Sequence, residues 1–187
     1  MKTHEFILVL QTPQGDYEQL ENALFEAGCD DATLSSRNGI VYLNFDREAD
    51  DLESAVVSAI RQVEQTKLNL VVRRVEPSDL VTSAEIARRL GRSRQSVQQL
   101  IAGSRGDGDF PLPVAGVTAK TMLWSWQDIM EWLINKDKLE DKSVYDNAVT
   151  LKQLNESLGV RKDDNQIRNI RRIAKLLGKK RGFNEFA

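Results

Sequence analysis

The stretch from Val81 to Ala102, VTSAEIARRLGRSRQSVQQLIA, predicts two short helices joined by a tight turn. Thr82 followed three residues later by Glu85 indicates a capping box, in which the hydroxyl accepts a bond from the first turn and the carboxylate reaches back. Gly91 ends the first helix where a left-handed residue is favoured. Ser93 is suited to begin the second helix. This spacing is typical of a helix-turn-helix.

The outward face of the second predicted helix carries side chains suited to reading DNA. Arginine binds guanine edges or phosphates, glutamine binds adenine, and serine binds either. No carboxylate interrupts this face, and the small Ala87 allows the two helices to cross closely. The alternative interpretation is an ordinary helical hairpin with a solvated face. The residues expected to contact DNA here are Arg92, Ser93, Arg94, Gln95 and Gln98.

The next segment, residues 110–133, reads FPLPVAGVTAKTMLWSWQDIMEWL and predicts a β-hairpin or wing followed by a third helix. Two prolines, a short apolar run and a glycine-containing turn come before the second run at Trp124. Ile129, Trp132 and Leu133 recur at helical spacing, so we expect a helix from Ser125 or Trp126 that packs under the hairpin.

Residues 80–134 resemble the MerR/excisionase (AlpA-like) winged helix-turn-helix family. Three segments carry the resemblance in order: EIARRLGRSRQSVQQLI, FPLPV and LWSWQDIMEWL. It implies insertion of the second helix into the major groove of double-stranded DNA, with phosphate contacts from the wing. Two departures are Arg92, at a turn position that is normally apolar, and the acidic loop 103–109. By position, the resemblance makes Arg94, Gln95 and Gln98 base readers and Arg92, Arg105 and Lys120 backbone contacts.

Charge is distributed unevenly along the 187 residues, although the net charge is only −2. Residues 1–79 carry seven basic and fifteen acidic side chains, whereas residues 161–187 carry nine basic and three acidic ones. A globally basic nucleic-acid binder is therefore excluded, and positive charge is concentrated at the tail. The 41% hydrophobic content is enough to fill the cores of two small domains and an appendage.

The sequence offers no recognisable catalytic, metal or cofactor site, so we expect no enzyme and no cofactor. The single cysteine, Cys29, fits a reducing cytosol and is expected to pack rather than react. His4 is the only histidine and is expected to be solvated. Without a long apolar run or a signal-peptide pattern, we expect a cytoplasmic protein with no membrane contact.

Residues 1–76 predict the element order β-α-β-β-α-β, which makes a ferredoxin-like sandwich. An Asn-Gly pair after Arg37 indicates a hairpin between the second and third strands. The fold hosts many functions and identifies none. The predicted strands span 5–11, 31–36, 40–45 and 69–75, and the helices begin at cap residues Asp16 and Asp50.

The acidic front domain is expected to pair, dock or sense rather than bind nucleic acid. The net charge of −8 over residues 1–79 opposes contact with phosphates, although Tyr42 and Phe45 on the third strand leave stacking on RNA bases as a weak alternative. The linker at residues 76–80 is short, so we expect rigid coupling to the helix-turn-helix.

The tail, residues 149–187, predicts a basic helical module in which Thr150 caps one helix and Gly159 ends it. A second, looser helix-turn-helix is one interpretation. The others are a helical pair that closes a dimer and an unfolded basic tail that touches phosphates. The tail residues expected to contact DNA are Arg168, Arg171, Arg172, Lys175, Lys179, Lys180 and Arg181.

The chain is thus predicted to be a multidomain α+β protein, with domains at 1–76, 80–135 and 149–187. We expect a sequence-specific DNA-binding protein, a prokaryotic transcription regulator that acts as a homodimer on double-stranded DNA. One alternative is an antitoxin or adaptor that holds a protein partner through its acidic front domain. Another is an excisionase-like architectural factor.

Overall fold

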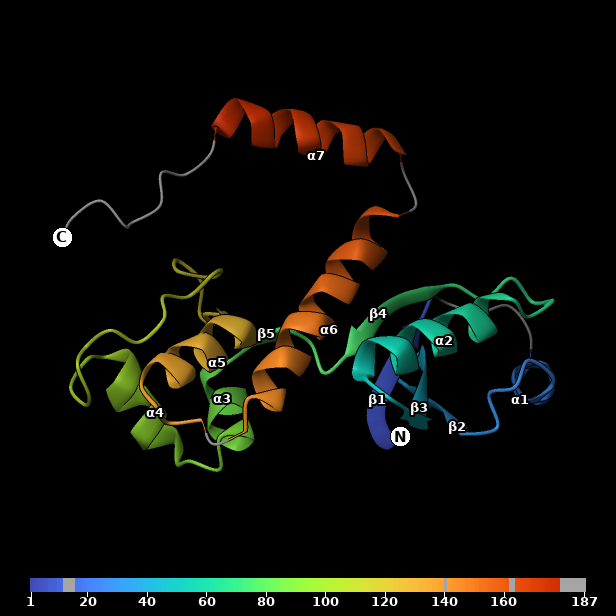
Figure 1. Ribbon diagram of the computed structural model, residues 1–187, viewed down its shortest axis with the longest axis horizontal. Helices are drawn as coiled ribbons and strands as arrows, with labels where there is room; N and C mark the ends of the chain where they lie inside the picture. The colour runs from blue at the N-terminus through green and yellow to red at the C-terminus, as the bar shows by residue number, and fades with distance from the viewer. Residues whose placement is uncertain (12–15, 140, 162–163, 179–187) are drawn as a thin grey trace.

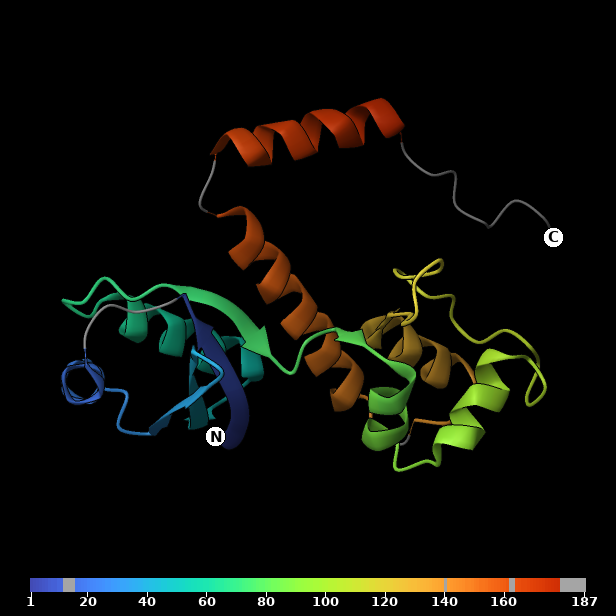
Figure 2. The same ribbon diagram turned by 180° about the vertical axis from the view of Figure 1, so that it is seen from behind.

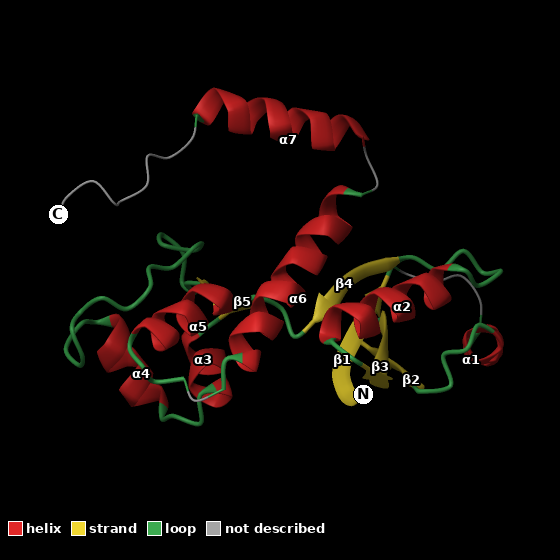
Figure 3. Ribbon diagram, viewed as in Figure 1, coloured by secondary structure: helices red, strands yellow, loops and turns green. Residues whose placement is uncertain are grey.

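The computed structural model describes residues 1–187 except 12–15, 140, 162–163 and 179–187. Its described part is a mixed α+β structure with seven α-helices, a four-stranded antiparallel sheet and a two-stranded one (Figures 1 and 3). The elements are β1 (Lys2–Leu10), α1 (Tyr17–Glu26), β2 (Ala32–Arg37), β3 (Ile40–Ala49), α2 (Leu52–Glu64), β4 (Val72–Glu76), β5 (Leu80–Val81), α3 (Ser83–Arg89), α4 (Arg94–Ile101), β6 (Trp124–Ser125), α5 (Trp126–Asn135), α6 (Ser143–Val160) and α7 (Asp164–Leu177).

The elements β1 to β4, with α1 and α2, form one body that we call the front lobe. Its strands lie in the order β2-β3-β1-β4, and every neighbouring pair is antiparallel. The helix α2 packs on β1, β3 and β4, while Leu20 and Leu24 of α1 enter the same core. The predicted order β-α-β-β-α-β is therefore observed along the chain.

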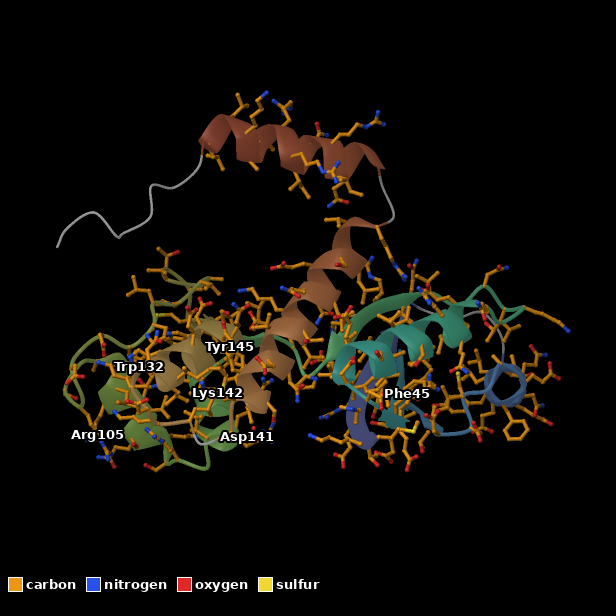
Figure 4. All side chains as sticks on the ribbon, in the orientation of Figure 1. Phe45, Arg105, Trp132, Asp141, Lys142 and Tyr145 are labelled. Carbon is orange, nitrogen blue, oxygen red and sulfur yellow. The ribbon has the colours of Figure 1, made fainter. Side chains whose placement is uncertain are left out.

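The core of the front lobe forms on the helix-facing side of the sheet. Phe6 lies opposite Phe45 in the register of β1 and β3, and their rings stack 5.2 Å apart. Leu8 lies opposite Leu43, and both are fully buried. Because Phe45 is a core residue, the idea that it stacks nucleic-acid bases is wrong. Figure 4 labels it inside this lobe.

A buried guanidinium closes one edge of this core. Arg47 donates two hydrogen bonds to the Asp31 carboxylate, at 2.7 and 2.8 Å, and a third to the Ser58 hydroxyl at 3.2 Å. Asp31 holds the pKa of Arg47 above its usual range. Beside this pair, burial raises the pKa of the Cys29 thiol, which packs in the core. A buried charge is tolerated only when it is paired in this way.

The hairpin between β2 and β3 confirms the predicted Asn-Gly turn. Asn38 and Gly39 both adopt positive φ, 53° and 77°, as a tight antiparallel turn requires. The first strand is longer than predicted, because β3 continues to Ala49 and provides a partner for Lys2. His4 on this strand is half-buried with its Nε2 enclosed, so the expectation that it is solvated is wrong.

The start of the fourth strand and the cap of the second helix also differ from the sequence prediction in this lobe. The fourth strand begins at Val72 rather than Asn69, because Asn69 lies in the left-handed region at φ 50°. The cap of α2 is Asp51 and not Asp50: its carboxylate accepts a 2.7 Å bond from the backbone N–H of Ser54. Asp50 and Asp51 have the same side chain, so the sequence alone does not show which of them caps the helix.

The elements β5 to α5 form the central lobe. Leu80 pairs with Ser125 and Val81 with Trp124, which joins the end of the linker to the start of α5. Asp79 strengthens this junction: its carbonyl accepts from Trp126 N–H at 2.7 Å, and its carboxylate accepts from the N–H of α5's second residue at 2.8 Å. The core of this lobe comprises Val81, Ile86, Ala87, Val97, Leu100, Trp124, Trp126, Ile129, Met130, Trp132, Leu133 and Ala148.

The helix α6 lies between the two lobes (Figures 1 and 2). Leu151 and Leu158 enter the core of the front lobe, and Ala148 enters that of the central lobe. The prediction that a helix starts at Thr150 is wrong, because α6 begins seven residues earlier and Thr150 lies inside it. The apolar residues of α6 are divided between two cores. In the sequence, those that follow Thr150 therefore look like the apolar face of a separate helix capped by Thr150.

Asn155 fastens α6 to the edge of the sheet. Its amide oxygen accepts from Val75 N–H at 2.8 Å, and its amide nitrogen donates to the Val75 carbonyl at 2.9 Å. The side chain thus takes the place of a fifth strand along β4. At the end of α6, Arg161 pairs with Glu64 of α2.

We predict that Asn155→Ala destabilises the protein by about 1–3 kcal/mol, because it leaves both backbone groups of a buried residue without partners. Urea-induced unfolding, followed by circular dichroism, measures this change. Gln153→Ala on the exposed side of the same helix is the matched control and is expected to change stability by less than about 0.5 kcal/mol. Equal effects of the two changes would contradict the assignment of Asn155 as the fastener.

Candidate nucleic-acid interface

The helix α4 has one buried and one exposed face. Val97 and Leu100 are buried in the central lobe, while Arg94, Gln95 and Gln98 are exposed. The three predicted reading residues therefore lie on a surface that is open to solvent, and no other described part of the chain packs over it.

The turn before α4 forms as its residues dictate. Gly91 adopts φ 60°, and the following Arg92 N–H donates to the Ala87 carbonyl at 2.9 Å. Ser93 then caps α4 by accepting from Ser96 N–H at 3.2 Å. Ala87 is buried at the contact between the two helices, as predicted. Arg92 is half-buried at this turn, and Ser93 is exposed.

The structure adds one residue to the exposed face of α4. Gln99 is exposed and follows Gln95 by four residues, so both lie on the same side of the helix. Its spacing of four residues from Gln95 would have predicted from the sequence that Gln99 lies on this face. Gln98, by contrast, already donates its amide N–H to the Ser83 hydroxyl at 3.0 Å, which orients it from the first turn of α3.

Arg105 borders the same face. Its guanidinium donates to the Ser96 hydroxyl at 3.0 Å, so the loop after α4 folds back along the helix. Figure 4 labels Arg105 at the margin of the central lobe. The predicted residues Arg92, Arg94 and Arg105 thus lie on α4 or directly beside it.

Two carboxylates of the acidic loop 103–109 pair with Lys136, the residue that follows α5. Lys136 lies 2.6 Å from an Asp107 oxygen and 2.7 Å from an Asp109 oxygen. Asp109 also accepts from the Trp132 indole N–H at 3.0 Å. Both partners hold the pKa of Asp109 below its usual range, with Lys136 the larger cause. The loop's negative charge is therefore largely balanced locally.

The segment 110–123, which we call the wing, forms less of a hairpin than predicted. Ala115 and Leu123 form an isolated bridge, and the run with Trp124 pairs with β5 rather than with the proline-rich segment. The indole N–H of Trp124 instead donates to the Pro111 carbonyl at 3.1 Å and holds that segment in place. Lys120 is exposed at the turn of this wing.

Glu85 forms the charged centre of α3. Its carboxylate accepts from Arg88 at 2.6 and 2.8 Å and from Arg89 at 2.8 Å. Hydrogen bonds from Arg88, together with Arg89, lower its pKa to about 2. The backbone half of the predicted capping box is present, with Thr82 accepting from Glu85 N–H at 3.2 Å. The carboxylate half is wrong, because two arginines compete for that carboxylate.

Arg89 connects α3 to the rest of the central lobe. It donates to the Ser78 carbonyl in the linker at 3.1 Å and lies 5.0 Å from the centre of the Trp126 ring. Through Glu85, Arg89 and Trp126, the orientation of α3 is fixed relative to both the linker and α5. This support positions α4, which packs on α3.

The described tail residues that were predicted to contact DNA do not lie near α4. Arg168, Arg171, Arg172 and Lys175 are exposed on α7, which lies apart from α4 in both views (Figures 1 and 2). Lys179, Lys180 and Arg181 fall outside the described residues. The structure therefore brings together the predicted residues around α4 but does not join the tail residues to them.

The described residues contain no group of three or more potential metal-ligating side chains. Within the same part of the chain, none of the helices combines the length and apolar character that crossing a bilayer requires. Comparison of the chain with protein-family models, curated proteins and solved structures finds no match.

We predict that Gly116→Ala disrupts the wing. Gly116 has φ 75°, and an added Cβ would collide with the Thr121 carbonyl oxygen. Gly108 is the matched control, because it has φ 74° and open space around the same position. We expect Gly116→Ala to lower the free energy of unfolding by about 1–3 kcal/mol more than Gly108→Ala does. Equal losses in thermal denaturation would show that the close approach is unimportant.

We predict that Glu85 stabilises the fold at neutral pH and loses this effect in acid. Its folded pKa of about 2 lies below the unfolded value of 4.5, so the stabilisation is complete above pH 4.5 and declines as pH falls toward 2. Glu85→Gln should lower stability by about 1 kcal/mol at pH 7, since the site is partly solvated. Denaturant unfolding should show a smaller difference from wild type at pH 3. A difference that grows in acid would contradict this assignment.

Proposed function

We propose that the protein is a sequence-specific DNA-binding protein, a prokaryotic transcription regulator that acts in the cytoplasm. The observation that carries this proposal is the exposed face of α4, where one arginine and three glutamines lie without a carboxylate among them. Such a face can enter the major groove, where glutamine pairs with adenine and arginine with guanine.

In this proposal Arg94, Gln95 and Gln99 read base edges. The Gln98 amide, held by Ser83, keeps its oxygen available as an acceptor for a base amino group. The pairing of Glu85 with Arg88 and Arg89 favours the same function, because an unpaired carboxylate on α3 would repel phosphates.

Phosphate contacts are proposed to surround this centre. Arg92 and Arg105 flank α4, and Lys120 is exposed on the wing, so three cations can release counterions from the duplex. This arrangement supports a winged helix-turn-helix of the MerR/excisionase type. The cations of α7 lie apart from α4, so we assign them to phosphates outside the groove that α4 reads.

The front lobe is proposed to have a ferredoxin-like topology. The strand order β2-β3-β1-β4 and the element order β-α-β-β-α-β both support it. With a net charge of −7 over residues 1–76, this lobe is unsuited to phosphates, and we assign it to contacts between proteins. A single small reading module discriminates weakly, so we propose that the protein binds a twofold site as a homodimer.

A second candidate function is an adaptor or antitoxin that holds another protein. A groove of about 390 Å³ between α1 and β2 favours it, because Leu24, Leu34 and the acidic Glu21 and Asp30 line it. Phe25, also in this lining, is 71% exposed. An exposed aromatic side chain is typical of contacts with a protein partner.

Purification of the protein distinguishes the two candidate functions, because they predict different bound partners. A stoichiometric partner that co-purifies with wild type and is lost with Phe25→Ala would favour the adaptor. A homodimer that binds one DNA site tightly without a partner would favour the regulator.

We predict that Arg94→Ala combined with Gln95→Ala weakens binding to the preferred site by about 2–4 kcal/mol, because each change removes a base contact. The preferred site is first obtained by selection from randomised duplexes, and affinity is measured by fluorescence anisotropy at fixed salt. Arg61→Ala removes an exposed cation from α2 of the front lobe and is the control for lost charge. A loss below about 1 kcal/mol for the double variant would exclude α4 as the reader.

A further inference from the structure

The helix α7 has two opposite faces of different chemistry. At 100° per residue, the three isoleucines, Ala174 and Leu177 lie on one side, while Arg168, Arg172 and Lys175 lie on the other. The apolar side is open to solvent: Ile170 and Ile173 are each 47% exposed, and Leu177 is 81% exposed. A row of large aliphatic side chains in water favours a partner.

The spacing of the apolar side chains identifies the kind of partner. Ile167, Ile170, Ala174 and Leu177 follow one another at intervals of three, four and three residues. This is the a/d pattern by which two helices pack along a common seam. The helix contains no Trp, Phe or Tyr, which amphipathic helices on a membrane surface commonly insert among the headgroups.

We propose that α7 pairs with the α7 of a second copy of this chain through the seam of Ile167, Ile170, Ala174 and Leu177. This pairing rests on the proposed DNA-binding function, to which it adds the surface that joins two reading modules. An isologous contact suits the seam, because the same apolar residues are presented by both copies.

The charges of α7 fit such a seam. Arg168, Arg172 and Lys175 lie on the side opposite the apolar row, so they point outward from a helix pair. They do not enter the seam, but two helices of like charge repel each other at long range. Salt screens this repulsion and leaves the apolar attraction intact.

The size of the contact sets its strength. Fourteen residues span about 21 Å. A two-helix contact of that length buries less than the roughly 1,200 Å² of standard stable interfaces. The pair is therefore weak in isolation, and it forms at high protein concentration or when two copies bind one duplex.

Opposite responses to salt separate this pairing from DNA binding. Sedimentation equilibrium of the full chain without DNA should show a dimer whose dissociation constant falls as salt rises from 0.05 M to about 1 M. DNA affinity should fall over the same range, because counterion release loses its effect. A monomer at every concentration and salt would overturn the pairing, whether or not the protein binds DNA.

The variant that tests the seam is Ile170→Gln combined with Leu177→Gln. Both side chains are exposed in one copy, so the change should leave the unfolding transition unaltered. It should abolish the salt-promoted dimer, weaken binding to a twofold site by about tenfold or more, and leave binding to a half-site unchanged. Arg172→Gln on the opposite face is the matched control and should retain the dimer.

Three results would overturn the pairing. One is a dimer that survives Ile170→Gln with Leu177→Gln. Another is equal loss of half-site and twofold binding by that variant. The third is a monomer that binds vesicles of phosphatidylcholine and phosphatidylglycerol through the same residues, which would assign the apolar face to a membrane surface. Failure of wild type to bind any duplex would instead reject the proposed function, while the sedimentation result would still decide the pairing.

Discussion

The arrangement of the whole molecule depends on how the linker and α6 are held together at Asp79. Its carbonyl and carboxylate both accept bonds from the first turn of α5, and Lys152 of α6 lies 4.0 Å from the carboxylate. Asp79 of the linker thus contacts both the central lobe and α6, the helix that packs into both cores. Because α6 also supplies Leu151 and Leu158 to the front lobe, the two lobes are joined by packing as well as by a short linker. A reading helix gains from this support, since its precision is set by the elements behind it.

Local pairing of acids with bases is the second constraint on the central lobe. Glu85 is held by two arginines, and Asp107 and Asp109 are held by Lys136. Cations thus balance the carboxylates of Glu85, Asp107 and Asp109 locally, although the chain as a whole is slightly acidic. Net charge is therefore a poor guide to the potential at one face, and the distribution decides which surface attracts a polyanion.

Much of this arrangement could be predicted from local sequence signals. The features that were predicted wrongly depend on partners that the local pattern does not identify. The Asn38-Gly39 turn and the caps at Thr82 and Ser93 depend on a few neighbouring residues, and all three were predicted. The start of α6 was missed because its stripe packs against two lobes distant in sequence. The partners of Glu85 were missed because Arg88 and Arg89 outcompete the backbone for its carboxylate. The exposed face of α4 followed from helical period alone, whereas the balance of charge in loop 103–109 required knowledge of where Lys136 lies.

The position of α7 bears on how one copy could engage DNA. This helix follows the end of α6 farthest from the central lobe, whereas α4 lies at the opposite margin of that lobe (Figures 1 and 2). In this arrangement the cations of α7 do not extend the surface around α4 within one copy. An eight-residue reading helix contacts only a few base pairs. Under the proposed function, discrimination comes from a second reading helix at a fixed spacing, and α6 sets that spacing if the two copies meet beyond its end. The length of α6 would in that case determine the separation of half-sites, much as a helical linker sets the distance between two domains.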